Sequence, residues 1–160
     1  MVILKEGMKA PTFKAKDQQG NTFTSAVMKG KKWVLYFYPQ DNTPTCTVQA
    51  CNLRDNFERL AAAGIEVIGV SPDEVKKHSK FSEKFSLPFI LLADTDHAVI
   101  DKYGVWGEKQ LYGRKYMGLH RTTFLIDEKG MIRKIIAKPK SKQHAEEILQ
   151  AWQTIESNGK

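Results

Sequence analysis

The sequence contains little cysteine and no long hydrophobic run. Its 160 residues include two cysteines, Cys46 and Cys51. In a cytosolic chain, as we expect from the features below, two cysteines argue against a structural disulfide framework and serve either chemistry or burial. No apolar run approaches the roughly 20 residues that a helix needs to cross a bilayer. The opening MVILKEGMKAP is too short and too quickly charged for a secretory signal. We therefore expect a cytoplasmic protein without membrane contact.

Several functional motifs are also missing. The chain has no C-x-x-C pair, which a thioredoxin-type reductase would need. The C-x4-C pair has no second pair of ligands nearby, and the histidines are widely spaced, so we expect no zinc site and no other cofactor. The net charge is +7, but the lysines are scattered and no nucleic-acid motif stands out. We therefore interpret the charge as a solvated surface and expect no nucleic-acid partner.

The composition is that of an ordinary globular protein. Apolar residues make up 41% of the chain and charged residues 27%. A chain of this length most simply forms one domain with a sizeable core. No repeat, linker or low-complexity segment occurs, so we expect a single domain over residues 1–160.

Residues 33–51, WVLYFYPQDNTPTCTVQAC, are the most informative stretch. The apolar run 33–38 predicts a buried strand, and Pro39 ends it. Turn residues follow at 41–45. Apolar residues then recur at helical spacing, which predicts a helix over 46–62 that ends at Gly64. Cys46 would lie in the first turn of this helix, where partial positive charge and free N–H groups should help a thiol to lose its proton.

The remaining segments alternate between strand and helix patterns. A hairpin is expected around the turn 17–21, between Phe13 and Phe23. Strands are expected at 65–70, 89–93, 122–126 and 131–137, the last two joined by a hairpin turn at 127–130. Helices are expected from Ser71-Pro72-Asp73 to 85, from 94–96 to 103, and over 142–156. The Gly-rich segment 104–121 is expected to be a loop, packed by Trp106, Tyr112 and Tyr116.

This order predicts an α/β fold. Strands that alternate with helices indicate a parallel sheet with helices on both faces, and the closing hairpin makes the sheet mixed. A thioredoxin-like fold with an N-terminal β-hairpin and a central mixed β-sheet flanked by helices suits the pattern. The periodicity alone does not separate it from other doubly wound folds.

A cysteine at a helix N-terminus can act as a nucleophile. Attack of a thiolate on a peroxide O–O bond would leave a sulfenic acid on Cys46, and a second thiol could condense with it to a disulfide. Cys51 is the one candidate for that thiol within the chain. The alternative is that both cysteines are small buried apolar residues.

The spacing of the two cysteines has a geometric consequence. In an intact helix, positions five apart are separated by roughly 8–9 Å between Cα atoms. A disulfide requires less than about 7 Å. We therefore expect Cys46 and Cys51 to bond only if the first turns of the helix unwind.

The segment YFYPQDNTPTCT at 36–47 resembles the active-site signature of the peroxiredoxins. It is most similar to that of the bacterioferritin comigratory protein, or peroxiredoxin Q, subfamily. The resemblance extends to GMKAPTF at 7–13, VIGVSPD at 67–73, YGVWGEK at 103–109 and HRTTFLIDEKG at 120–130. It implies a thioredoxin-like fold and a thiol-dependent peroxidase that reduces hydrogen peroxide and organic hydroperoxides.

The resemblance also implies residue roles. Cys46 matches the peroxidatic cysteine and Cys51 the resolving cysteine. Thr43 matches the threonine that contacts the thiolate and the peroxide, Pro39 the proline that shields the thiolate from water, and Arg121 an arginine brought from a distant strand. Thioredoxin, or a similar dithiol protein, would be the reductant, and the protein would be a monomer.

Some alternatives remain open. Thr43 could be an ordinary helix cap, and Arg121 could form a surface salt bridge. An external thiol could resolve Cys46 in place of Cys51, or the chain could be a basic binding or chaperone-like module. Two residues depart from the subfamily pattern: Thr45 stands where Gly is usual, and Gln49 where many relatives have Glu. The stiffer Thr45 is expected to slow unwinding.

Overall fold

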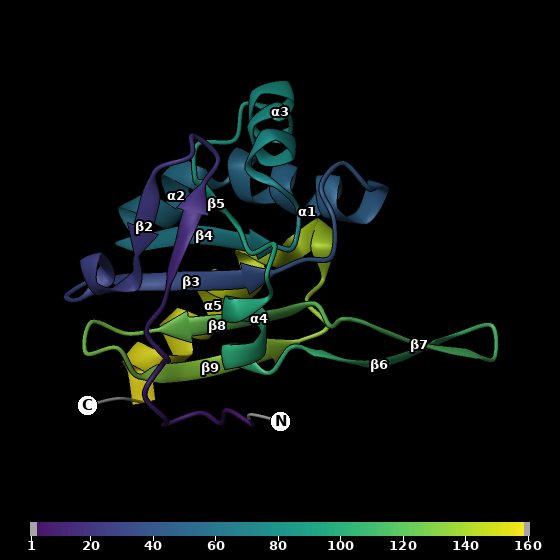
Figure 1. The fold of residues 1–160 in the computed structure, drawn as a ribbon. Coiled ribbons are helices and arrows are strands. Elements are labelled where there is room, and N and C mark those ends of the chain that lie inside the picture. The colour runs from purple at the N-terminus through teal and green to yellow at the C-terminus, as the bar shows by residue number, and fades with distance from the viewer. Residues whose placement is uncertain (1–2, 159–160) are drawn as a thin grey trace.

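A computed structural model describes residues 3–158 and has a seven-stranded mixed sheet at its centre (Figure 1). The strand order is β2-β1-β5-β4-β3-β8-β9. Strands β3, β4 and β5 are parallel, and the other neighbours are antiparallel. This confirms the predicted mixed sheet. The strand bounds are β1 Lys14–Asp17, β2 Thr22–Thr24, β3 Lys32–Phe37, β4 Ile65–Ser71, β5 Ile90–Ala93, β8 Thr122–Ile126 and β9 Ile132–Ala137.

Helices cover both faces of the sheet, as predicted, but unequally. Their bounds are α1 Pro44–Asp55, α2 Phe57–Ala62, α3 Val75–Phe85, α4 Ala98–Tyr103 and α5 His144–Asn158, with short 3₁₀ helices at Ser25–Met28 and Ser141–Gln143. Side chains of α1, α2, α3 and α5 join one buried cluster, and those of α4 join the other. None of these helices is both long and apolar enough to cross a membrane.

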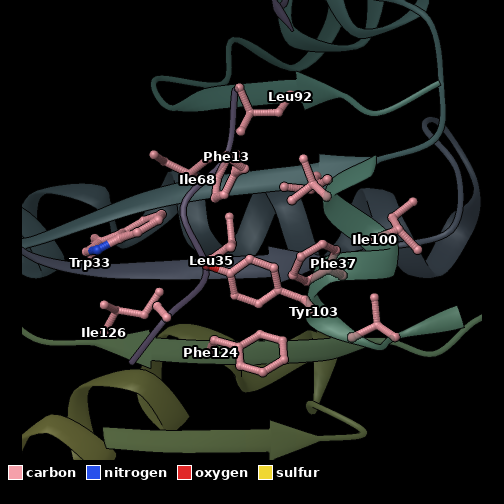
Figure 2. Close-up of a cluster of buried hydrophobic side chains, with 14 of the residues drawn as sticks. Phe13, Trp33, Leu35, Phe37, Ile68, Leu92, Ile100, Tyr103, Phe124 and Ile126 are labelled. Carbon is pink, nitrogen blue, oxygen red and sulfur yellow. The ribbon is translucent and has the colours of Figure 1, made fainter. Parts of the chain in front are cut away.

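Strand β3 divides the core into these two clusters because successive side chains of a strand point to opposite faces. Trp33, Leu35 and Phe37 face the side of α4. Figure 2 shows Leu35 and Phe37 beside Tyr103, with Trp33 farther along the strand. Val34 and Tyr36 face the other way and pack with the cluster that contains Cys46. The candidate active site therefore lies on the face that carries four of the helices.

The predicted N-terminal hairpin is present. Lys14 pairs with Thr24 across β1 and β2. The carboxylate of Asp17 accepts the N–H groups of Gln19 and Asn21, which closes the turn. Phe13 and Phe23 are both buried and pack against each other in the core.

The prediction of one helix over 46–62 is wrong in two respects. Helix α1 begins at Pro44, which suits the first helical position because proline has no N–H to satisfy there. The helix then breaks at Asn56, whose φ of −110° and ψ of 15° are not helical. The Asn56 side chain donates to the carbonyl of Asn52 at 2.9 Å, so it competes with the helical backbone pattern.

The predicted loop at 104–121 is a second hairpin. Strands β6 Trp106–Leu111 and β7 Arg114–Leu119 pair antiparallel and project away from the body of the molecule (Figure 1). Tyr112 and Gly113 form its two-residue turn with φ of 51° and 78°. A tyrosine is unusual at such a position, which is why the turn gave no clear signal. Tyr112 is 96% exposed and Tyr116 is exposed, so only Trp106 packs as expected, against His97.

The third helix begins later than predicted. Ser71 is the last residue of β4, and α3 starts at Val75 after an extended Glu74. The Ser71 hydroxyl accepts the N–H of Asp73 at 3.1 Å, so it closes a turn rather than capping a helix. The acids at 94–96 do support α4 as expected: Asp94 accepts the N–H groups of Val99 and Ile100.

Candidate active site

Cys46 occupies the first turn of α1 and is 2% exposed. Thr43 is the N-cap of the helix, with an extended backbone, and its hydroxyl oxygen accepts the N–H of Cys46 at 3.4 Å. The start of a helix carries partial positive charge from its unpaired N–H groups. The local sequence thus buries the thiol next to this partial positive charge.

Arg121 reaches Cys46 from a distant part of the chain. It lies between β7 and β8, and its neighbour Thr122 pairs with Phe37 at the end of β3. Antiparallel pairing of β8 with β3 therefore brings the arginine to the point where the chain leaves β3 for α1. Its Nη2 donates to Cys46 Sγ at 3.1 Å, and its Nη1 donates to Gln49 Oε1 at 3.4 Å.

The structure brings together Cys46, Thr43 and Arg121. The described bonds of Thr43 are those of a helix cap: besides accepting from Cys46, its hydroxyl donates to the carbonyl of Gln40 at 3.4 Å. Pro39 is half-buried, two residues beyond the end of β3. Cys51 is half-buried on the same helix as Cys46, and both thiols are free.

Gln49 is a site residue whose contact the sequence did not reveal. It is completely buried, and it lies one helical turn after Cys46, so both side chains face Arg121. Its Nε2 has no partner among the described residues. The spacing of three residues on one helix is the signal that could have identified it.

Tyr36 adds a protonated hydroxyl to the same region. Burial raises the pKa of Tyr36 well above its ordinary value, and the negative charges of Cys46 and Asp41 raise it further, while Arg121 opposes them. Its hydroxyl is buried and without a hydrogen-bond partner in the described part of the chain. Tyr36 therefore keeps its proton near the thiol.

Within residues 3–158, one group of side chains has the proximity of metal ligands: Asp41, Asp73 and His78, whose ligand atoms lie within 4.8 Å of one another. These atoms already bond to each other and to protein neighbours. Asp73, for example, accepts from the Asp41 N–H at 2.6 Å and from Lys77 at 3.2 Å. We interpret the group as a hydrogen-bonded cluster.

Comparison with known proteins identifies the family. Residues 7–135 match the model of the AhpC/TSA family. The chain is 47% identical over 149 residues to peroxiredoxin Bcp of Bacillus subtilis, covering 93% of this chain and 95% of that protein. It is 45% identical over 146 residues to peroxiredoxin Bcp of Escherichia coli K12, covering 91% and 94%.

Solved structures agree with this assignment. A structure of peroxiredoxin Q from Xanthomonas campestris superposes with a TM-score of 0.83 at 33% identity, covering 89% of this chain and 90% of that one. BcpB of Mycobacterium tuberculosis superposes with a TM-score of 0.84 at 32% identity, covering 96% and 99%. The resemblance drawn from the sequence is therefore confirmed. The chain belongs to the AhpC/TSA family and is a Bcp-type peroxiredoxin, an enzyme that reduces peroxides with a cysteine thiol.

Proposed function

We propose that Cys46 is the peroxidatic cysteine and that Arg121 is its electrostatic partner. The contact of 3.1 Å between Arg121 Nη2 and Cys46 Sγ, at the start of α1, carries this proposal. A guanidinium stays charged at every relevant pH, so it can stabilise the thiolate without titrating. The positive end of the helix acts in the same direction.

In the first step, the Cys46 thiolate attacks one oxygen of the peroxide. A sulfur–oxygen bond forms, the O–O bond breaks, and the second oxygen leaves as water or an alcohol after it takes up a proton. Negative charge develops on both oxygens as the bond breaks, so donors already in place lower the barrier. Arg121 supplies such donors, and Thr43 holds the helix start in place through its cap.

In the second step, the Cys51 thiol attacks the sulfenic sulfur of Cys46 and expels water. This forms a Cys46–Cys51 disulfide, which a dithiol protein reduces back to two thiols by exchange. We propose that thioredoxin is this reductant. We also propose that the peroxidase is a monomer and that it is located in the cytoplasm. Pro39, half-buried beside the loop, would limit access of water to the thiolate.

Hydrogen peroxide and organic hydroperoxides are the proposed substrates. A solved structure of the bacterioferritin comigratory protein of Xanthomonas campestris, 32% identical to this chain, is described as giving insight into the alkyl peroxide reduction activity of that protein. A buried thiol in a cluster with apolar side chains such as Ala50 and Leu53 is compatible with an alkyl substituent.

The decisive experiment is peroxide consumption with thioredoxin and its reductase, comparing wild type with Cys46→Ser and Cys51→Ser. We expect both variants to lose turnover, and we expect one equivalent of peroxide to remove two hydrogens from the wild-type mass. Loss of turnover in Cys46→Ser alone would mean that an external thiol, and not Cys51, resolves the sulfenic acid of Cys46. Wild-type activity with dithiothreitol but not with thioredoxin would rule out thioredoxin as the reductant and would still support the peroxidase activity.

A further inference from the structure

A buried polar network lies beneath the loop that joins β3 to α1. Asp41, in the middle of this loop, is 2% exposed. Its Oδ1 accepts from the Tyr38 hydroxyl at 2.6 Å, and its backbone N–H donates to Asp73 Oδ2 at 2.6 Å. Its Oδ2 bonds to Nδ1 of His78. Three bonds to three different residues therefore hold Asp41 in place.

His78 connects this loop to the rest of the fold. It lies on α3, is 0% exposed, and its Nε2 bonds to the carbonyl of Leu92 on β5 at 2.9 Å. A carbonyl can only accept, so Nε2 carries a hydrogen. Asp41 and His78 then share one further proton, either as a carboxylate with an imidazolium or as a carboxylic acid with a neutral imidazole. Both forms of the pair have zero net charge, which is compatible with burial.

Tyr38 completes the network as a donor. Burial raises its pKa well above the ordinary value, and the nearby Tyr36 and Asp41 raise it further. The hydroxyl therefore remains protonated and donates to Asp41. None of these groups touches Cys46 in the described contacts, so the reaction at the thiol does not use them directly.

The network acts on the site through the chain that follows Asp41. Asn42 adopts a left-handed φ of 60°, and its side chain accepts from Lys84 of α3 at 3.4 Å. Thr43 then caps α1 and accepts the N–H of Cys46. The position of Asp41 thus determines where the first turn of α1 begins, and with it the position of Cys46 relative to Arg121.

We propose that Asp41 and His78 form a latch between the β3–α1 loop and α3, a pair of positioning residues that keeps Cys46 within reach of Arg121. This inference rests on the proposed function. Attack on peroxide needs α1 to be folded around Cys46, whereas disulfide formation with Cys51 needs it to unwind. A broken latch should therefore slow the first step and speed the second.

The test follows both steps in His78→Leu, which removes the partner of Asp41. Rapid mixing with hydrogen peroxide, quenching and mass spectrometry give the rate of sulfenic acid formation in a Cys51→Ser background. The same method with both cysteines present gives the ratio of disulfide to sulfinic acid at a fixed peroxide excess. Loss of this buried bond should slow the first step about tenfold or more, and we expect the ratio of disulfide to sulfinic acid to rise about threefold.

Tyr38→Phe provides a second, milder variant. It removes one hydroxyl from the network and keeps the aromatic packing, so we expect changes of about two- to fivefold in the same two directions. Asp127→Asn is the matched control. Asp127 is also a buried aspartate that fixes a loop, through bonds to the N–H groups of Lys129 and Met131, but it lies at the opposite end of β8 from Arg121. Both steps should keep wild-type values in this control.

General destabilisation leaves both steps unchanged as long as the folded protein predominates. A broken latch changes the two steps in opposite directions, so the two explanations can be separated. Wild-type values in His78→Leu, or a slower first step with a ratio of disulfide to sulfinic acid that does not rise, would overturn the latch. Should His78→Leu fail to fold, wild-type values in Tyr38→Phe would overturn it. A wild type without peroxidase activity would overturn the proposed function and the latch with it, whereas an active wild type with unchanged variants overturns the latch alone.

Discussion

At the scale of single residues, Arg121 must be placed so that its guanidinium makes two bonds at once. Its guanidinium donates to two different acceptors, the thiol sulfur of Cys46 and the amide oxygen of Gln49. The planar fork of arginine suits such a pair, whereas the ammonium of lysine is a single point charge on a flexible stem. Because Gln49 is neutral, the arginine has an uncharged acceptor there and not a carboxylate.

Replacement of Arg121 by lysine should therefore slow the reaction with peroxide. Loss of a charge-assisted bond costs about 1.5–3 kcal/mol. This corresponds to a fall of about 10- to 150-fold in the rate of sulfenic acid formation, measured by rapid mixing with hydrogen peroxide. Arg133→Lys is the control, because Arg133 pairs with Asp127 away from the site. Equal rates in Arg121→Lys and wild type would show that the charge alone matters and the geometry does not.

At the scale of elements, helix α1 has two differently supported parts. Beyond Cys51, the side chain of Asn52 donates to the carbonyl of Lys142 at 2.9 Å and accepts the N–H of Ala145 at 2.8 Å. Arg54 donates to the carbonyl of Phe85 at 2.8 Å. Side-chain bonds to α3, to α5 and to the turn before α5 thus brace the end of the helix, while both cysteines lie before this braced part.

Oxidation should unwind the part of α1 that precedes Asn52. Because Cys46 and Cys51 are too far apart in an intact helix, disulfide formation should remove helical structure from about residues 44–51. Far-ultraviolet circular dichroism at 222 nm should show a weaker helical signal after one equivalent of peroxide, and dithiothreitol should restore it. Cys51→Ser, which cannot form the bond, should keep its signal. A fully oxidised wild type with an unchanged spectrum would contradict this expectation.

At the scale of the whole molecule, α5 closes the buried cluster that contains Cys46 and packs on the side of β3 and β8. His144, at the start of this helix, is completely buried and bonds through Nε2 to the Thr123 hydroxyl at 2.9 Å. Its Nδ1 faces Glu147 at 3.1 Å, and Glu147 also accepts the N–H of Lys140 at 2.7 Å. One carboxylate therefore fixes the turn and the helix start together.

This arrangement predicts a pH-dependent contribution to stability. Burial raises the pKa of Glu147, but the bonds from His144 and Lys140 lower it more, so its net pKa lies below the ordinary value of 4.5. A lowered pKa means that the ionised form stabilises the fold above pH 4.5, and that this contribution is lost as the pH falls through the folded-state pKa. Wild type should exceed Glu147→Gln in free energy of unfolding at pH 7, and the difference should shrink towards about pH 3.

Urea unfolding of both proteins at the two pH values measures this difference. Glu146→Gln is the matched control, because Glu146 is an exposed neighbour on the same helix whose pair with Arg59 lies at the surface. The control should differ little from wild type at either pH. A difference for Glu147→Gln that stays constant between the two pH values would show that the charge of Glu147 does not contribute.

The sequence by itself determined the local features of this protein. The apolar run 33–38 determined a buried strand, because β-branched and aromatic side chains suit a sheet. Turn residues before Cys46 determined that the thiol would lie at a helix start. The motif around Pro39, Thr43 and Cys46 indicated the reaction class, and the family comparison confirmed it.

Only the tertiary structure decided how distant residues meet. The family resemblance named Arg121, but the pairing of β8 with β3 is what brings it to Cys46, 75 positions away. Asp41 and His78 are 37 positions apart, and their pairing depends on how α3 packs under the loop. The sequence also did not predict the hairpin of β6 and β7, because Tyr112 occupies a turn position that usually favours Gly or Asn. Periodicity and turn chemistry report on neighbours along the chain, whereas these contacts arise from strand pairing and packing between elements.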